Sequence, residues 1–330
     1  MGPPPPSAAP PTSSTTTNGP NTNSSLIPIG THGLFVSLSG PALSPESDDP
    51  LVVVIPGAGD VASSYVAVER LLRPFTRTLL YDRSGLGRSE KGPSCPNAVR
   101  AAEELRALLS ALAITGPLLL CAHSYGGIVA REFLHLYPDR VAGMVLCDAS
   151  TERANEFFNI PDPNVQAVMA DLKFAVVTGL RGDTVLSDQE WRVRAKDIYA
   201  GVETAQAEAA AFVEVCQNLK AKEQIQNCAL GDRPLSVIRA NTPRDYERIY
   251  EAGVRAGNGT AEQRRAFREL LDRWEGVDQM MQEEQLGLSA TTRFVRLQDC
   301  GHNVHLVRPD VIVEEIGWAR GRIMEDLKCS

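Results

Sequence analysis

Five short apolar runs, rich in valine, isoleucine and leucine, alternate along the chain with segments of helical pattern. They cover 51–57, 77–82, 117–124, 141–150 and 234–240, and a sixth run of more mixed character covers 292–302. Continuous apolar strands that are separated by helices are typical of a parallel sheet covered on both faces. The pattern therefore predicts an α/β fold in which a mostly parallel β-sheet is flanked by helices, with 32–40 as an edge strand.

The segment that follows Asn97 has the spacing of an amphipathic helix. Its apolar positions are Ala98, Ala102, Leu105, Leu109 and Leu112. These recur at helical intervals, and an asparagine directly before them is a favourable N-cap. We expect this helix to return the chain to the strand that ends at Ser124.

The alternation of strands and helices breaks after Asp148. Residues 151–233 have a helical composition, and the stretch is too long for an ordinary connection. It predicts an inserted helical cap, or lid, with 25–150 and 234–330 forming the core. A second stretch, 241–291, also has a helical pattern. Large apolar residues in the cap are tentative substrate-binding residues, although packing of the cap on the sheet is an equally good interpretation of each: Phe157, Phe158, Phe174 and Trp191.

The first 24 residues are rich in proline, serine, threonine and asparagine. Such a composition cannot build a core, so residues 1–24 predict a disordered tail. The tail has neither the basic region nor the apolar run of a secretory signal, and no later stretch approaches the ~18 apolar residues of a membrane span. We therefore expect a cytoplasmic protein.

The charge balance argues against nucleic acid as a partner. The chain of 330 residues has 33 Lys and Arg against 41 Asp and Glu, a formal net charge of -8, and no strongly basic stretch. Its seven cysteines include no C-x-x-C pair, and no H-E-x-x-H motif accompanies His302 and His305. We expect a small-molecule substrate, no metal and no cofactor.

The run Ala-His-Ser-Tyr-Gly at 122–126 places Ser124 between an apolar strand and a helix. Small residues at 122 and 126 permit a sharp turn, which lifts the serine to the helix N-terminus where backbone amides favour developing negative charge. The short pattern also occurs by chance, so an ordinary serine at a strand-to-helix junction is the alternative. The flanking strand and helix favour a nucleophile elbow.

A nucleophilic serine needs a histidine base and a carboxylate that orients the base. Of the five histidines, His302 follows the last predicted strand in Asp-Cys-Gly-His, where a glycine lets the loop bring the ring over the sheet edge. His123 adjoins the serine and is expected to point the other way along the strand, and His135 lies far down the next helix. His302 is therefore the candidate base.

Two aspartates keep the chain order serine, acid, histidine. Asp148 ends the strand after the nucleophile strand, and Asp245 lies five residues beyond the following strand. The turn directly after Ala240 contains no carboxylate, so Asp148 is better placed. Asp245 remains the alternative acid, and a structural role for Asp148 at the entrance to the cap is the third interpretation.

Backbone amides are the expected donors to an oxyanion. One belongs to Tyr125, directly after the serine, and the other to Ala58 in the loop Pro-Gly-Ala-Gly-Asp at 56–60. Glycines in this loop let it pass close to a substrate, although a tight turn that requires glycine is the simpler interpretation.

Several ordered motifs together resemble the α/β-hydrolase fold superfamily, in its capped branch with a serine elbow. They are VVVIPGAG at 52–59, YDRSGLGRS at 81–89, CAHSYGGIVAREF at 121–133, YPDRVAGMVLCDAS at 137–150 and CGHNVHLVRPDVIVEEI at 300–316. The resemblance spans about 50–330 and carries the family roles to Ser124, His302 and the backbone of Ala58 and Tyr125. The resemblance to branches that have Asp-Ala-Ser at the positions equivalent to 148–150 implies that this aspartate is the acid. A serine in the elbow excludes membership of the branches that have an aspartate nucleophile.

Three departures from the family pattern concern the site. Ala122 replaces the first elbow glycine, Pro56-Gly57 replaces the usual His-Gly before the oxyanion loop, and the usual acid after 234–240 is missing. The first is compatible with the turn, the second affects the shape of the loop, and the third makes the acid the least secure member of the triad.

The sequence and the resemblance together predict a serine hydrolase that cleaves a carboxyl ester, lactone or thioester of a small to medium apolar molecule. The alternatives are a non-hydrolytic enzyme of this fold, such as a lyase or a C–C bond-cleaving enzyme, and a ligand-binding receptor. A remote alternative is an NAD(P)-dependent oxidoreductase, because 57–62 fit a dinucleotide fingerprint with Asp82 as its acid. Arg83 and Arg88 are candidates for contact with an anionic substrate, although solvated surface charges are the commoner case.

Overall fold

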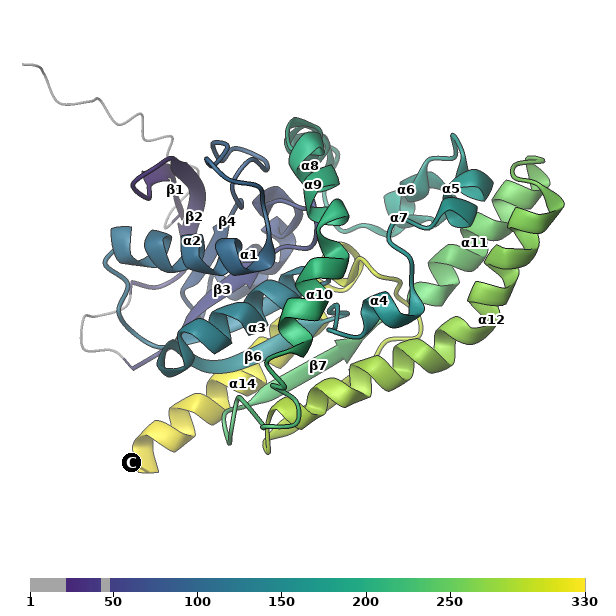
Figure 1. Ribbon diagram of the computed structural model, residues 1–330. Coiled ribbons are helices and arrows are strands. Elements are labelled where there is room, and N and C mark those ends of the chain that lie inside the picture. Colours follow the sequence, from purple (N-terminus) through teal and green to yellow (C-terminus); the bar gives the residue numbers. More distant parts are fainter. Residues whose placement is uncertain (1–21, 43–47, 330) are drawn as a thin grey trace, which may run out of the picture.

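One sheet of eight strands forms the centre of the computed structural model, which describes residues 22–42 and 48–329 (Figure 1). In their spatial order the strands are β1 (Thr22–Pro28), β2 (Gly33–Ser39), β4 (Thr78–Tyr81), β3 (Leu51–Ile55), β5 (Leu118–His123), β6 (Val141–Cys147), β7 (Leu235–Arg239) and β8 (Thr292–Arg296). The pairs β1–β2 and β2–β4 are antiparallel and all the others are parallel. The predicted α/β fold with a mostly parallel sheet is confirmed.

Helices cover both faces of the sheet. Because successive side chains of a strand point to opposite faces, Val53 of β3 packs on one side and Val52 on the other. The helices on the first side include α2 (Ala98–Ala111) and α3 (Gly126–Leu136), and those on the second include α1 (Val66–Leu72) and α14 (Pro309–Cys329). The Asn97 side chain accepts a hydrogen bond from the Arg100 amide, which confirms the predicted N-cap of α2.

The edge of the sheet differs from the prediction. The strand predicted at 32–40 is β2, which lies inside the sheet because β1 pairs with it along its whole length. The sequence of β1, Thr-Asn-Ser-Ser-Leu-Ile-Pro, is mostly polar and mostly exposed, so it lacks the apolar pattern that marks the other strands. Residues 22–24 of the predicted tail thus belong to a strand, and the rest of that prediction, 1–21, lies outside the described residues.

The remaining helices follow β6, β7 and β8. Those between β6 and β7 are α4 (Ala154–Phe157), α5 (Pro163–Met169), α6 (Phe174–Val177), α7 (Leu180–Asp183), α8 (Asp188–Ala200), α9 (Val202–Ala210) and α10 (Phe212–Lys220). Those between β7 and β8 are α11 (Thr242–Arg255) and α12 (Ala261–Glu284), and β8 is followed by α13 (Val304–Val307).

The helices that follow β7 join those that follow β6 at one end of the sheet. α5 packs against both α11 and α12 around Val168, Ile249 and Phe267. Figure 1 shows α5, α11 and the first part of α12 together beyond the ends of the strands, while the rest of α12 runs back alongside β7. The division of the chain into a core and a cap at 151–233 stays a prediction, and this packing adds α11 and α12 to the layer that covers the strand ends.

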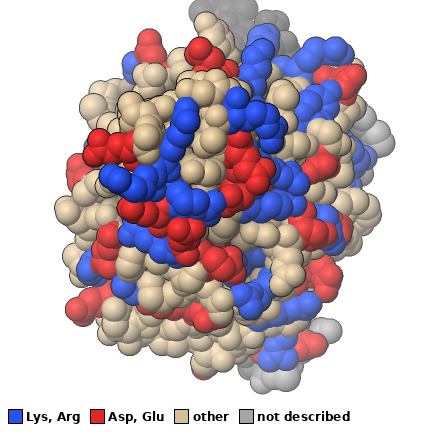
Figure 2. Space-filling view, turned by 90° about the vertical axis from the view of Figure 1, so that its right-hand side faces the viewer, with Lys and Arg blue, Asp and Glu red and all other residues tan. Residues whose placement is uncertain are grey.

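Charges of both signs are mixed on the face that carries α11 and α12, where Figure 2 shows acidic and basic side chains interspersed. Among the helices of the described ranges, none has the length and apolar character that crossing a bilayer requires.

Candidate active site

Ser124 stands at a sharp turn between β5 and α3. Its φ of 53° is in the left-handed region, which is unusual for a residue with a side chain and typical of a strained turn. The turn presses the start of α3 against its surroundings: a Cβ at Gly126 would overlap with the Ile55 carbonyl oxygen, and one at Gly127 would lie 2.6 Å from Ala149 Cβ. Glycine is required at both positions, as the elbow predicts at 126.

His302 and Asp148 are joined by a hydrogen bond of 2.6 Å between Nδ1 and Oδ2. The aspartate is buried and accepts two further hydrogen bonds, from the Ala240 amide at 3.0 Å and from Thr242 Oγ1 at 2.6 Å. Because a carboxylate can only accept, Nδ1 of His302 carries the proton and Nε2 is left free as a base.

The two partners shift each other's pKa in opposite directions. Burial lowers the pKa of His302, but the hydrogen bond and the negative charge of Asp148 outweigh it, so the pKa lies above its ordinary value. Burial raises the pKa of Asp148, but the His302 contact and the hydrogen bonds from Thr242 and Ala240 leave it below its ordinary value. The pair therefore favours an ionised aspartate that stabilises a protonated imidazole.

Asp245, the alternative acid, contacts the backbone of the loop after β8 that carries His302. Its carboxylate lies against Gly301, where a Cβ would overlap with it, and Arg244 Nη2 lies 3.3 Å from Oδ1. Burial raises the pKa of Asp245, and the charge of Arg244 and the backbone of His302 partly offset the increase. Of the two candidate acids, Asp148 is the one that is hydrogen-bonded to the imidazole.

Ser124, Asp148 and His302 line one cavity of about 520 Å³. Its other walls are mostly apolar and come from helices after β6 and after β7; they include Phe158, Phe174, Met169, Ile249, Trp274 and Met281. Polar side chains also line the cavity, and among them Asp278 is buried and hydrogen-bonded to Arg239. Burial, with the charge of Asp148, raises the pKa of Asp278 to about 7.

Two of the four predicted cap aromatics line this cavity and two do not. Phe158 and Phe174 face it, whereas Phe157 lies under Arg153, whose guanidinium carbon is 5.1 Å from the ring centre. Trp191 lies between Arg181 and Arg194 and away from the cavity. Neighbouring residues on a short irregular helix face different ways, which composition alone does not resolve.

The part of the wall that α11 and α12 supply was not predicted from the sequence. Tyr246, Trp274 and Met281 come from these helices, and the rings of Tyr246 and Trp274 lie 4.4 Å apart. The helical pattern of 241–291 was visible, but the pattern does not say which face turns toward the strand ends.

The loop predicted to hold the oxyanion lies beside the serine. A Cβ at Gly57 would be 3.3 Å from Ser124 Cβ, and Ala58 is exposed at the tip of the loop. Tyr125 is buried at the start of α3. Within the described part of the chain, no protein acceptor is assigned to the amides of Ala58 and Tyr125.

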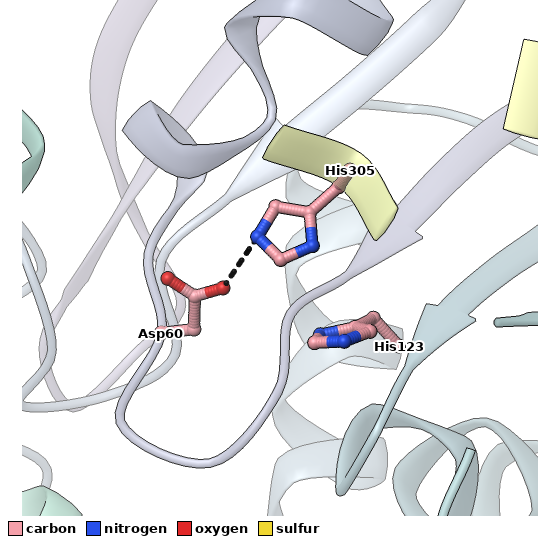
Figure 3. A group of neighbouring side chains, drawn as sticks. All are labelled: Asp60, His123 and His305. Atoms are coloured by element: carbon pink, nitrogen blue, oxygen red, sulfur yellow. Dashed lines mark ion pairs between the residues drawn. The ribbon is translucent and has the colours of Figure 1, made fainter. Parts of the chain in front are cut away.

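A buried group of metal-ligand type includes Asp60, the last residue of this loop. Asp60, His123 and His305 bring one ligand atom each within 4.8 Å of one another, and His305 Nε2 is 3.3 Å from Asp60 Oδ2 (Figure 3). Both ring nitrogens of His123 already have partners, Tyr65 Oη at 3.1 Å and the His302 carbonyl at 2.9 Å. We interpret the group as a buried polar network that supports the loop that carries His302.

The dinucleotide interpretation of 57–62 conflicts with the surroundings of Asp82. This residue has no exposed surface, and its carboxylate accepts hydrogen bonds from the Ala62 amide at 2.6 Å and the Arg88 amide at 2.9 Å. Its oxygens are not accessible to a ribose. Arg83 is likewise buried, which contradicts the expectation of a solvated loop charge.

Comparison with known proteins places these features in a family. A model described as "Alpha/beta hydrolase family" matches residues 52–315. "Probable transporter efuK" of Hormonema carpetanum is 30% identical over 308 residues, which are 90% of this chain and 43% of that protein, so the chain spans less than half of its length. "AB hydrolase superfamily protein" of Gibberella zeae is 29% identical over 294 residues, covering 86% of this chain and 89% of that protein.

Solved structures share the fold at low identity. A thermophilic esterase from Thermogutta terrifontis superposes with a TM-score of 0.56 and 18% identity, covering 91% of this chain and 98% of the other. At this identity the likeness concerns the fold alone.

Proposed function

The chain belongs to the alpha/beta hydrolase family, and from this premise we propose that it is a serine hydrolase that cleaves a carboxyl ester, lactone or thioester of a small to medium apolar molecule. The observation that carries the proposal is the hydrogen bond between His302 and Asp148 in the same cavity as Ser124. An acid, a base and a hydroxyl in this order are what nucleophilic acyl transfer requires.

In the first half of the proposed reaction, Ser124 Oγ attacks the substrate carbonyl carbon while His302 Nε2 takes the hydroxyl proton. Asp148 stabilises the imidazolium, and His302 then returns the proton to the leaving alcohol or thiol, which departs as the acyl-enzyme forms. In the second half, water attacks the acyl carbon with His302 as base, and Ser124 leaves with the proton restored.

The negative charge on the tetrahedral intermediate needs donors that are already in place. The proposed donors are the amides of Ala58 and Tyr125, and the start of α3 adds the positive end of a helix dipole. Donors with no protein acceptor are suited to this role because they lose no internal bond when the oxyanion forms.

The walls of the cavity support the proposed class of substrate. A volume of about 520 Å³ suits a molecule of small to medium size, and the mainly aromatic and aliphatic lining favours an apolar one. We propose that Phe158 and Phe174 of the predicted cap, with Trp274 of α12, contact its apolar part.

Labelling with a fluorophosphonate, followed by intact-protein mass spectrometry, tests the proposal directly. We expect one adduct on the wild type and none on Ser124→Ala, together with ester turnover that Ser124→Ala reduces by several orders of magnitude. A folded wild type that is neither labelled nor active on esters, lactones and thioesters would contradict the proposal and favour non-hydrolytic chemistry or ligand binding.

A further inference from the structure

The loop 56–59 is held from below by one buried arginine. Arg83 Nη1 donates to the Pro56 carbonyl at 2.6 Å, and Nη2 donates to the Gly57 carbonyl at 2.7 Å. The guanidinium carbon also lies 5.4 Å from the ring centre of Tyr125. Arg83 thus contacts the segments that carry both proposed oxyanion donors.

The same arginine is paired with a carboxylate of the predicted cap. Glu208 on α9 accepts from Arg83 Nε at 2.8 Å through one oxygen and from Nη2 at 2.9 Å through the other. It also accepts from the Gly59 amide at 2.8 Å. Side chains of the pair are 3% exposed each, so either partner would be largely shielded from solvent if the other were lost.

α9 lies directly on the loop and on the turn that carries the arginine. A Cβ at Gly59 would be 2.6 Å from Ala205 Cβ, and a Cβ at Gly85 would overlap with Thr204 Oγ1. No side chain fits between the helix and these glycines. The position of α9 and the shape of the loop are therefore coupled by contact as well as by charge.

We propose that Arg83 and Glu208 are positioning residues that fix the oxyanion loop in its active shape, so that the predicted cap controls the oxyanion hole through α9. The inference rests on the proposed function. Arg83 binds the carbonyls of Pro56 and Gly57, and Glu208 binds the Gly59 amide. The Ala58 amide lies between these anchored groups and is thereby held toward the serine.

The physical basis is the rigidity that a planar, bidentate pair imposes. Guanidinium and carboxylate meet in a fixed geometry. Nη1 and Nη2 of Arg83 and Oε2 of Glu208 also bond the backbone of the loop. Loss of one partner leaves a buried charge and frees the loop, and displacement of a donor by about 1 Å is enough to cost on the order of 10²-fold in rate.

Glu208→Gln is the first test, because it keeps the volume and removes the charge. An NH2 group replaces one carboxylate oxygen and faces a donor of Arg83, so a hydrogen bond between the two side chains is lost. We expect kcat for a chromogenic ester to fall roughly 10- to 100-fold while KM changes less than about threefold. The rate of fluorophosphonate labelling should fall in parallel, since that reaction also develops charge in the oxyanion hole.

Glu152→Gln is the matched control. Glu152 forms a bidentate pair with Arg131 that is similarly buried, with side-chain exposures of 7% and 0%, but that does not contact the loop. Both variants should lose thermal stability, and only Glu208→Gln should lose kcat. Equal kcat values in the two variants would overturn the proposal.

Hydrogen–deuterium exchange supplies a readout that does not depend on activity. The peptide covering 56–62 should exchange faster in Glu208→Gln than in the wild type and be unchanged in Glu152→Gln. If the wild type proves inactive, the proposed function fails. Unchanged exchange of this peptide in Glu208→Gln would show that the pair of Arg83 and Glu208 does not fix the loop.

Arg83→Lys keeps the test open if Glu208→Gln does not fold. Lysine retains the charge opposite Glu208 but cannot reach the carboxylate and both carbonyls at once. Arg83→Lys should reduce kcat and speed hydrogen–deuterium exchange at 56–62. If kcat and the exchange rate both equal those of the wild type, the proposal is overturned.

Discussion

Replacement of Asp148 by asparagine tests the proposed acid, and the structure determines how the new side chain must sit. Oδ1 accepts from the Ala240 amide, which is part of the backbone and cannot rotate away. The asparagine oxygen is therefore expected to keep this position, so that its amide nitrogen takes the place of Oδ2. The hydroxyl of Thr242, which donates to Oδ2 at 2.6 Å, can rotate and accept instead.

The consequence falls on the tautomer of His302. An amide nitrogen opposite Nδ1 is a donor, so Nδ1 must become the acceptor and the ring proton moves to Nε2. Nε2 then cannot accept the proton of Ser124. Loss of the correct tautomer with intact geometry costs about 10⁴-fold in kcat, which corresponds to about 5 kcal/mol of transition-state stabilisation.

The assay is steady-state hydrolysis of the ester on which the wild type is most active, with Asp148→Asn, Asp245→Asn and the wild type at matched concentration. Asp245→Asn is the comparison because this carboxylate contacts the backbone at Gly301 and not the imidazole. We expect it to lose less than about tenfold. Circular dichroism should show that both variants are folded.

Two results would contradict the proposed role of Asp148. Asp148→Asn with more than a tenth of wild-type kcat would mean that the aspartate does not set the tautomer. Loss of activity in Asp245→Asn with retention in Asp148→Asn would transfer the role of acid to Asp245.

Three further predictions concern the base, the elbow and the cavity. Because the pKa of His302 lies above 6.5 and only the neutral ring accepts a proton, kcat/KM should rise with pH to a plateau, with a midpoint above 6.5; a midpoint below 6 would contradict this. Gly126→Ala should destabilise the fold by roughly 3 kcal/mol or more in chemical denaturation, since the new Cβ overlaps with a backbone oxygen of β3. Gly116→Ala is the control and should be nearly neutral, because a Cβ at Gly116 meets open space. Phe158→Ala should raise KM for apolar esters by about tenfold, and Phe157→Ala, outside the cavity, should not; equal effects would remove Phe158 from the binding wall.

Elements with a local signal were predictable from the sequence. The run 117–124 appears as β5, Leu118–His123, and the helix that Asn97 caps begins at Ala98. Buried strands and capped helices leave their pattern within a window of ten to fifteen residues. β1 has no such pattern, because its pairing with β2 depends on backbone hydrogen bonds that polar residues form as well as apolar ones.

The sharp turn at Ser124 and the position of His302 at the sheet edge were also predictable from the sequence, which left two candidate acids. Asp148 and Asp245 both satisfy the required order along the chain. The parallel pairing of β6 with β7 carries Asp148 to the Ala240 amide and to the imidazole, while α11 starts so soon after β7 that Asp245 turns under Gly301. A choice between them needs the relative position of neighbouring strands.

The amino-acid sequence was enough to predict the apolar strands of the sheet, the turn at Ser124 and the candidate base, because each leaves a signal in neighbouring residues of the chain. The tertiary structure alone decided which faces of the covering helices form the cavity and what holds the oxyanion loop. Arg83 and Glu208 are 125 positions apart, and neither stands in a pattern that points to the other. Contacts of this kind arise from the packing of whole elements, which periodicity and spacing do not report.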